Sequence, residues 1–246
     1  VTRALTALGP AYIKFGQILS TRPDVVGDEL AVQLRVLQDK LPPFPIEEAQ
    51  KMIEAELERP LASMFQDFSA PVAAASIAQV HRAKLASDGA DVAVKVLRPG
   101  IERAFRRDID AFYFAARMVE VLAPGARRLR PLDVIAHFEG VVLGELDLRL
   151  ESSAAGEFAA NTESDEGFQL PKINWSLSGK NVMTMDWAEG ISAGDNAALD
   201  AVGHDRRRIG ERILQLFLSH ALRDGFFHAD LHQGNIKIAA NGDVIA

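Results

Sequence analysis

Hydrophobic residues recur along the chain with two different periods, one typical of helices and one typical of strands. Within residues 4–57 the spacing predicts helices that end before Pro60, with Asp28 as an expected N-cap. Four leucines there share one helix face: Leu30, Leu34, Leu37 and Leu41. Helical spacing returns in three later segments, 103–122, 131–158 and 205–223. Much of the chain is therefore expected to be helical.

Strand-like segments lie between and after these helices. Residues 60–71 are expected to form a connector. Short apolar runs then predict strands at 77–85, 92–97, 170–175, 181–187, 236–239 and 244–246. Asn241-Gly242 is typical of a hairpin turn between the last two of these strands. Helices and strands mixed in this order indicate an α+β fold.

Composition narrows the class of protein. The chain has 246 residues, of which 48% are hydrophobic and 25% charged, as in an ordinary globular protein. The net charge, 27 − 34 = −7, argues against nucleic acid as a general partner. The absence of cysteine excludes disulfides and thiolate metal sites. No apolar run approaches the roughly 18 residues of a membrane span, and no signal peptide opens the chain. A cytoplasmic location is expected, with association of the protein with a membrane as the alternative.

One stretch near the end of the chain carries candidate chemistry. Asp230 is followed five positions later by Asn235, and a predicted strand comes next. In the catalytic loop of kinases an aspartate accepts the proton of the substrate hydroxyl, and an asparagine five residues on holds Mg²⁺. The alternative is a polar turn after a helix, in which Asp, Gly and Asn serve only the turn geometry.

A second candidate is Lys95, which follows Val92-Ala93-Val94 in a predicted strand. In kinases the lysine of a Val-Ala-Ile-Lys strand reaches the α- and β-phosphates of ATP. Taken alone, such a lysine is more often an exposed residue on the face or edge of a sheet, because short motifs match by chance. Its place after a hairpin, before a helical region and well upstream of Asp230 favours the kinase interpretation.

Four motifs together resemble the UbiB family of atypical protein-kinase-like proteins, also called aarF-domain kinases. They are Lys14-Phe15-Gly16-Gln17, Ala73-Ala74-Ala75-Ser76-Ile77-Ala78-Gln79-Val80-His81, the acidic stretch from Glu145 to Glu151, and His228-Ala229-Asp230-x-His232-x-Gly234-Asn235. They occur in the family's order and span positions 14 to 235. The resemblance implies a two-lobed protein-kinase-like α+β fold with an N-terminal helical extension and, in this chain, an incomplete large lobe.

The resemblance also assigns roles to charged residues. Lys95 would be the phosphate-binding lysine, and Glu151 would be its partner on a neighbouring helix, with the two forming an ion pair in the cleft between the lobes. Asp230 would act at the substrate hydroxyl, as in the kinase catalytic loop. These three residues would form the catalytic set.

Two further pairs belong to motifs that the resemblance treats as family signatures. Lys14 and Gln17 lie three apart and so on one helix face, and this face would pack over the cleft near the Glu-x-Asp pair, Glu145 and Asp147. An ion pair between Lys14 and Glu145 is expected. The alternative for Lys14 and Gln17 is that they are surface residues of an amphipathic helix. The alternative for Glu145 and Asp147 is that they lie on a solvated acidic helix face.

ATP and Mg²⁺ are the cofactors that the resemblance implies. Met185 would stand at the back of the adenine pocket, and the backbone of Asp186, Trp187 and Ala188 would meet the adenine edge. Asn235 would hold the metal ion.

The phosphate loop would be Ala73-Ala74-Ala75-Ser76, where ordinary kinases use glycines that allow close backbone approach. Each added Cβ keeps the backbone further from the phosphates, which disfavours the phosphate position of a protein kinase. The resemblance accordingly implies an ATPase-like or small-molecule-directed activity.

The resemblance divides the chain into an N-terminal helical extension (1–60), a kinase-like small lobe (61–187) and a partial large lobe (188–246). The chain begins at Val1 and stops within a predicted strand, before the metal-binding aspartate that kinases place next. We therefore expect a piece of a longer protein, inactive by itself.

The function implied for the longer protein is an atypical kinase or ATPase that supports ubiquinone or other isoprenoid-lipid biosynthesis. Its partners would be an isoprenoid lipid or quinone-biosynthesis proteins at a membrane surface. A protein or small-molecule kinase and a non-catalytic nucleotide-sensing scaffold stay as alternatives. The substrate, the lipid and the oligomeric state do not follow from the sequence.

Overall fold

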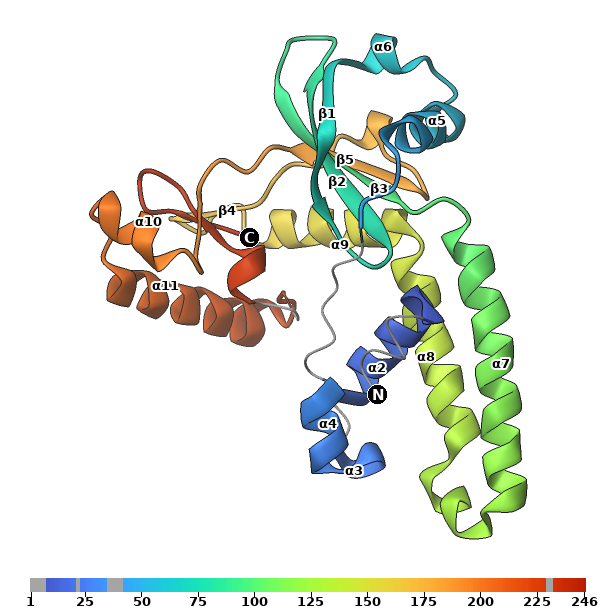
Figure 1. Cartoon of the computed structure of the whole chain (residues 1–246). Helices are drawn as coiled ribbons and strands as arrows, with labels where there is room; N and C mark the ends of the chain where they lie inside the picture. The colour runs from blue at the N-terminus through green and yellow to red at the C-terminus, as the bar shows by residue number, and fades with distance from the viewer. Residues whose placement is uncertain (1–7, 21–22, 35–41, 229–231) are drawn as a thin grey trace.

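The computed structural model describes residues 8–20, 23–34, 42–228 and 232–246. A four-stranded sheet lies at one end of the molecule, and a helical hairpin of α7 (Ile101–Leu122) and α8 (Pro131–Glu145) projects away from it (Figure 1). A second small sheet lies to one side with α10 (Asn196–Ala201) and α11 (Arg206–Ser219). The mixture of helices and sheets confirms the predicted α+β class.

The first sheet has the order β1-β2-β3-β5, with antiparallel pairing throughout. Its strands are β1 (Phe65–Ala74), β2 (Ala78–Leu85), β3 (Asp91–Leu97) and β5 (Val182–Asp186). Because successive side chains of a strand point to opposite faces, β3 buries Val92, Val94 and Val96 on one face and places Lys95 on the other. The position of Lys95 therefore follows from the burial of its neighbours.

Two of the predictions for segments outside the helices are wrong. Residues 60–71, expected as a connector, contain α6 (Leu61–Met64) and most of β1. β1 is an edge strand whose register against β2 shifts three times, so its side chains do not alternate regularly, and an edge position also tolerates Pro71. The segment 170–175 is not a strand, since β4 is Phe168–Gln169 and only an isolated bridge joins Ile173 to Met185.

The predicted helix over 131–158 is broken in two. α8 ends at Glu145 and α9 (Leu148–Asn161) begins three residues later. Asp147 caps the new helix by accepting a hydrogen bond from the backbone N–H of Arg149, at 3.1 Å. Leu148, which is fully buried, donates its own N–H to the carbonyl of Lys180 at 2.9 Å. The break turns the chain so that α9 runs under the first sheet (Figure 1).

The N-terminal helix α2 (Pro10–Ser20) rests on the hairpin (Figure 1). Phe15 stacks on Phe112 of α7 with ring centroids 4.7 Å apart, and it meets Phe138 of α8 edge-on at 5.1 Å. Tyr12 adds an edge contact to Phe112 at 4.7 Å. Such pairs add about 0.5–1.5 kcal/mol each beyond the burial of their surface, so aromatic packing holds α2 in place.

Two short helices, α3 (Pro23–Val26) and α4 (Asp28–Leu34), follow α2. α4 begins at Asp28, close to the predicted cap, and buries Leu34. Leu37 and Leu41 of the predicted leucine face lie outside the described residues.

The linker before α5 (Ile46–Leu57) is held to the first sheet by buried hydrogen bonds. The Gln79 amide accepts from the N–H of Phe44 at 3.1 Å and donates to its carbonyl at 3.3 Å. The same amide nitrogen donates to Nε2 of His81 at 2.9 Å, so the ring carries its proton on Nδ1 and donates it to the Ser69 carbonyl at 2.8 Å. α5 then covers the valine face of the sheet, with Ile53 fully buried.

The second sheet has the order β4-β8-β7-β6. Its other strands are β6 (Ile191–Ser192), β7 (Lys237–Ile238) and β8 (Val244–Ile245). The turn between β7 and β8 places Gly242 at φ 89°, as the predicted hairpin turn requires. A separate apolar core, which includes Leu199 of α10 and Leu216 of α11, joins this sheet to the two helices. Helix α11 ends in one turn of π-helix, η3 (His220–Asp224).

None of the helices in the described ranges is both long enough and apolar enough to cross a membrane. The boundaries at residues 60 and 187 stay predictions.

Replacing Phe138 by alanine should lower the free energy of unfolding by about 3–5 kcal/mol, because its fully buried ring contacts both Phe15 and Phe112. Phe114→Ala is the matched control, since this phenylalanine lies on the same hairpin but is 68% exposed; its effect should stay within about 0.5 kcal/mol. Denaturant unfolding of the full-length protein measures both changes. Equal losses would contradict the packing described for the hairpin.

Burial lowers the pKa of His81 below its ordinary value, against the opposing effect of the hydrogen bond to Ser69. Below the unfolded-state pKa of about 6.5 the unfolded chain binds a proton that the folded chain does not. The stability that neutral His81 provides is therefore complete above that pH and is lost as the pH falls towards the folded-state pKa.

Unfolding measured from about pH 7 to about pH 5 should consequently show a smaller loss of stability in His81→Gln than in the unsubstituted protein. His137→Gln is the control for removing a histidine from the chain, because His137 is exposed on α8. An unchanged slope in His81→Gln would show that His81 is not held neutral.

Candidate nucleotide site

Lys95 and Glu151 form the expected ion pair between the first sheet and α9. The Nζ atom of Lys95 lies 2.7 Å from each carboxylate oxygen of Glu151. Glu151 lies in the first turn of α9, where the helix dipole favours a carboxylate. The two side chains are 22% and 46% exposed, respectively, so the pair lies at the boundary between protein and solvent.

The ion pair forms part of the wall of a cavity of about 670 Å³. This volume is within the range typical of small-molecule sites. Polar groups come from Lys95, Glu151, His228 and Asn235, and the larger apolar part of the wall includes Phe158, Leu170, Ile173, Met183, Met185 and Phe227. A few polar groups that converge on a mostly apolar cavity are typical of ligand binding.

The C-terminal loop contributes Asn235 to this cavity. Asp230 itself lies outside the described residues. From His232 onward the loop forms a 3₁₀ turn, η4 (Gln233–Asn235), in which Nδ1 of His232 accepts the N–H of Gly234 at 3.0 Å. A Cβ at position 234 would lie 2.8 Å from the His232 ring, so a larger residue there would displace the ring that accepts this hydrogen bond. The loop thus positions Asn235 through backbone geometry.

The residues expected at the adenine edge are divided between two hollows. Met185 lines the main cavity, whereas Asp186, Trp187 and Ala188 line a neighbouring one of about 510 Å³ that shares Leu170 and Pro171 with it. The N–H groups of Asp186 and Trp187 are already donated, to the carbonyls of Lys172 (2.9 Å) and Asp91 (3.1 Å). Within the described part of the chain, the N–H of Ala188 makes no such bond. Ala188 is therefore the best placed of the three to meet a ligand.

The alanine loop does not line the main cavity, contrary to the expectation for a phosphate loop. The guanidinium of Arg98 donates two hydrogen bonds to the carbonyl of Ala75, at 3.1 and 2.9 Å, and a third to that of Pro42 at 2.9 Å. Ser76 is fully buried, and its hydroxyl makes no hydrogen bond to any described residue. The loop is thus tied back to the N-terminal linker, which the sequence did not indicate for Arg98.

The two signature motifs meet at one point. Lys14 Nζ lies 2.7 Å from a carboxylate oxygen of Glu145, as expected, and the two side chains are 17% and 35% exposed. Asp147 instead binds Arg149 at 2.6 Å, and this hydrogen bond lowers the pKa of its carboxyl group. Gln17 lies one turn further along α2, and neither Lys14 nor Gln17 lines the cavity.

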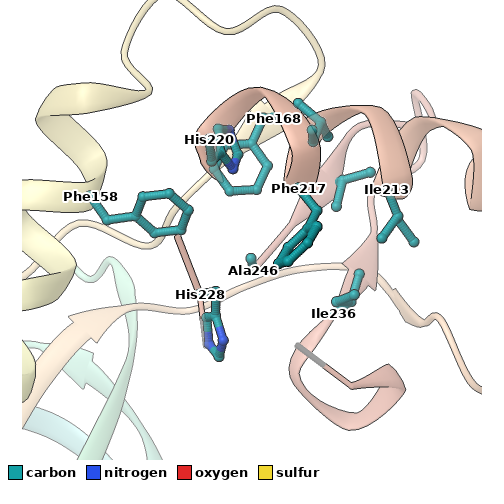
Figure 2. A pocket seen from close by; sticks show the side chains of 10 residues that line it. Phe158, Phe168, Ile213, Phe217, His220, His228, Ile236 and Ala246 are labelled. Atoms are coloured by element: carbon teal, nitrogen blue, oxygen red, sulfur yellow. The ribbon is translucent and has the colours of Figure 1, made fainter. Parts of the chain in front are cut away.

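A smaller hollow of about 20 Å³ lies beside the main cavity, under α11. Figure 2 shows phenylalanine and isoleucine side chains around it, together with His220 and His228. This space suffices for about one water molecule, so it is a gap in the core and not a ligand site.

A partly buried cluster of polar side chains, which the sequence did not reveal, lies beside this hollow. Asp165 lies 3.0 Å from Nε2 of His220 and 2.7 Å from Nη1 of Arg223. The hydrogen bond from Arg223, assisted by that from His220, holds the pKa of Asp165 below its ordinary value. The group joins the segment after α9 to the end of α11, from which the chain leads to Asn235.

Within the described ranges, no three histidine, aspartate or glutamate side chains gather closely enough to hold a metal ion. The residues that the cavity does bring together are Lys95, Glu151, Met185 and Asn235. They include the lysine and its carboxylate, one adenine-pocket residue and the amide expected at the metal.

Comparisons with known proteins show the family of the chain. Residues 36–246 match the ABC1 atypical kinase-like domain. The chain is 42% identical over 236 residues to a protein named probable protein kinase UbiB from Marinobacter nauticus, covering 96% of this chain and 43% of that protein. A protein of the same name from Shewanella baltica is 44% identical over 237 residues, covering 96% of this chain and 43% of that protein. Another from Vibrio cholerae is 43% identical over 239 residues, covering 97% of this chain and 44% of that protein.

The chain thus spans less than half the length of these relatives. The domain match nevertheless extends over most of its residues, and identities of 42–44% over almost the whole chain are high enough to show a common family. The chain therefore belongs to the ABC1 atypical kinase-like family, as the resemblance of its four motifs to UbiB proteins predicted.

Proposed function

We propose that this chain binds ATP with Mg²⁺ and that the longer protein to which it belongs transfers or hydrolyses the terminal phosphoryl group. The observation that carries the proposal is the Lys95–Glu151 ion pair in the wall of a ligand-sized cavity that Asn235 also lines. These residues come from β3, α9 and the C-terminal loop, which lie far apart in the sequence.

The donor set suits a nucleotide. Lys95 would meet the phosphates, with Glu151 fixing its position, and the apolar wall around Ile173 and Met185 would receive the adenine. Asn235 would hold Mg²⁺, which when bound neutralises charge on the phosphates. Asp230 would act at the attacking hydroxyl or water, as predicted from its spacing to Asn235.

A peptide substrate is disfavoured in this proposal. The alanine loop lies outside the cavity and is held by Arg98, so it would not close over the phosphates as a glycine-rich loop does. We therefore favour ATP hydrolysis or transfer to a small molecule, in support of ubiquinone or other isoprenoid-lipid biosynthesis. The name of the relatives, probable protein kinase UbiB, keeps protein phosphorylation as the second candidate.

Lys95→Met in the full-length protein should lower ATP turnover by about a hundredfold or more, since a preorganised charge at the phosphates would be lost. Glu151→Gln should lower turnover as well, and the double variant should be no worse than Lys95→Met because the two residues act as a unit. Lys172→Met is the control, because Lys172 is exposed and does not line the cavity. Turnover that survives in Lys95→Met would contradict the site.

ATP turnover, measured with and without isoprenoid lipid and candidate protein substrates, separates the alternatives. Hydrolysis raised by lipid supports the proposal, whereas transfer of phosphate to protein supports the second candidate. Calorimetric binding of ATP without turnover under any condition would indicate a nucleotide-sensing scaffold.

A further inference from the structure

The end of the α7–α8 hairpin is an exposed surface that the proposed function does not use. We call residues 114–130 the hairpin tip. They comprise the last turns of α7, the 3₁₀ segment η1 (Pro124–Leu129) and Arg130. Figure 1 shows the tip at the far end of the hairpin, away from both sheets and from α9. The tip is therefore free to meet something outside the described fold.

The hairpin tip exposes large apolar side chains. Phe114, Val121 and Leu122 are 68%, 65% and 74% exposed, and Met118 is 38% exposed. Their spacing of four, three and one places them on one side of α7. The opposite side of the same helix buries Phe112 and Ala116 against α8 and α2. The exposed apolar side chains thus form a second face, which the hairpin's own packing does not need.

Arginines flank this apolar face. Residues 114–133 contain four arginines and two acidic residues, a net charge of 4 − 2 = +2, although the whole chain carries −7. Arg130 pairs with Asp133 at 2.6 Å, and Arg127 donates to the carbonyl of Glu120 at 2.9 Å. Arg117 and Arg128 are exposed and form no ion pair with any described residue. The positive charge is concentrated where the apolar side chains are.

We propose that the hairpin tip docks on the surface of an anionic membrane. Phe114, Met118, Val121 and Leu122 would enter the boundary between lipid headgroups and acyl chains, and the arginines would meet the phosphates. Apolar side chains bordered by arginine are the combination that binds this interface, and juxtaposed basic residues select anionic lipid. The proposal rests on the hairpin alone and does not require nucleotide binding.

A membrane suits this surface better than a folded partner does. The apolar side chains lie on the outside of a projecting helix end, where a soft bilayer can surround them. Arginine stems can lie along apolar surface while the guanidinium stays at the level of the phosphates. An apolar protein groove would gain little from the exposed positive charge beside it.

The test uses the full-length protein with a single labelling site. Because this chain has no cysteine, Leu122→Cys, with any cysteine elsewhere replaced, can carry an environment-sensitive fluorophore at the tip. Vesicles are made of phosphatidylcholine alone or with a third of the lipid replaced by phosphatidylserine. We expect the emission to shift to the blue on the anionic vesicles and to change far less on the neutral ones. Val202→Cys, at a 60% exposed site beside α10, should not respond.

Charge reversal supplies the second arm. In a variant with both Arg127→Glu and Arg128→Glu, the lipid concentration needed for half of the response of the Leu122→Cys label should rise by at least about 25-fold. This follows from a loss of about fivefold in binding for each arginine removed. Arg206→Glu with Arg207→Glu changes the net charge equally but lies on α11, and it should have little effect.

Three outcomes of the vesicle measurements would overturn the proposal. They are no shift on anionic vesicles, an equal shift on neutral vesicles, and equal weakening by the two double reversals. A label already protected before vesicles are added would show that protein covers the hairpin tip, which would also overturn it.

Discussion

The placement of α9 is the constraint on which the rest of the site depends. It brings Glu151 within 2.7 Å of Lys95, a residue 56 positions earlier in the chain. An ion pair as exposed as this one contributes about 1 kcal/mol at most, so it cannot itself hold the helix. The helix is positioned by the break after Glu145, the cap at Asp147, the burial of Leu148 in the hairpin core and the hydrogen bond from its N–H to the Lys180 carbonyl. The ion pair is thus a consequence of packing.

The N-terminal segments act on this arrangement from two directions. α2 packs its aromatic side chains into the hairpin and sets Lys14 against Glu145, at the end of the helix that precedes the break. α5 covers the opposite face of the sheet, and the linker before it is held by Gln79 and Arg98. The N-terminal segments therefore pack against both the hairpin and the sheet. Lys14 and Gln17, which were expected to pack over the cleft, do not line the cavity.

Local periodicity predicted most of the fold because the signal is local. The alternation that buries Val92, Val94 and Val96 also sets the direction of Lys95, and α7 shows clear helical spacing. β1 was missed because its bulges remove that alternation, and the break at Leu146–Asp147 was missed because both sides are helical. The pairing of Lys95 with Glu151, and of Lys14 with Glu145, came from the family resemblance, since no spacing rule connects residues so far apart.

The role of Arg98 could not be predicted, and it changes the interpretation of the alanine loop. In the sequence it only begins the Arg98-Pro99-Gly100 stretch that ends β3. In the structure its guanidinium joins the Ala75 carbonyl to the linker carbonyl of Pro42, and burial lowers its pKa. A loop without glycine has little backbone freedom, and a carbonyl held by two donors has less. In the proposed function, phosphate binding therefore falls to Lys95, whose position is set by the valines beside it, and the loop serves to connect the sheet to the N-terminal helices.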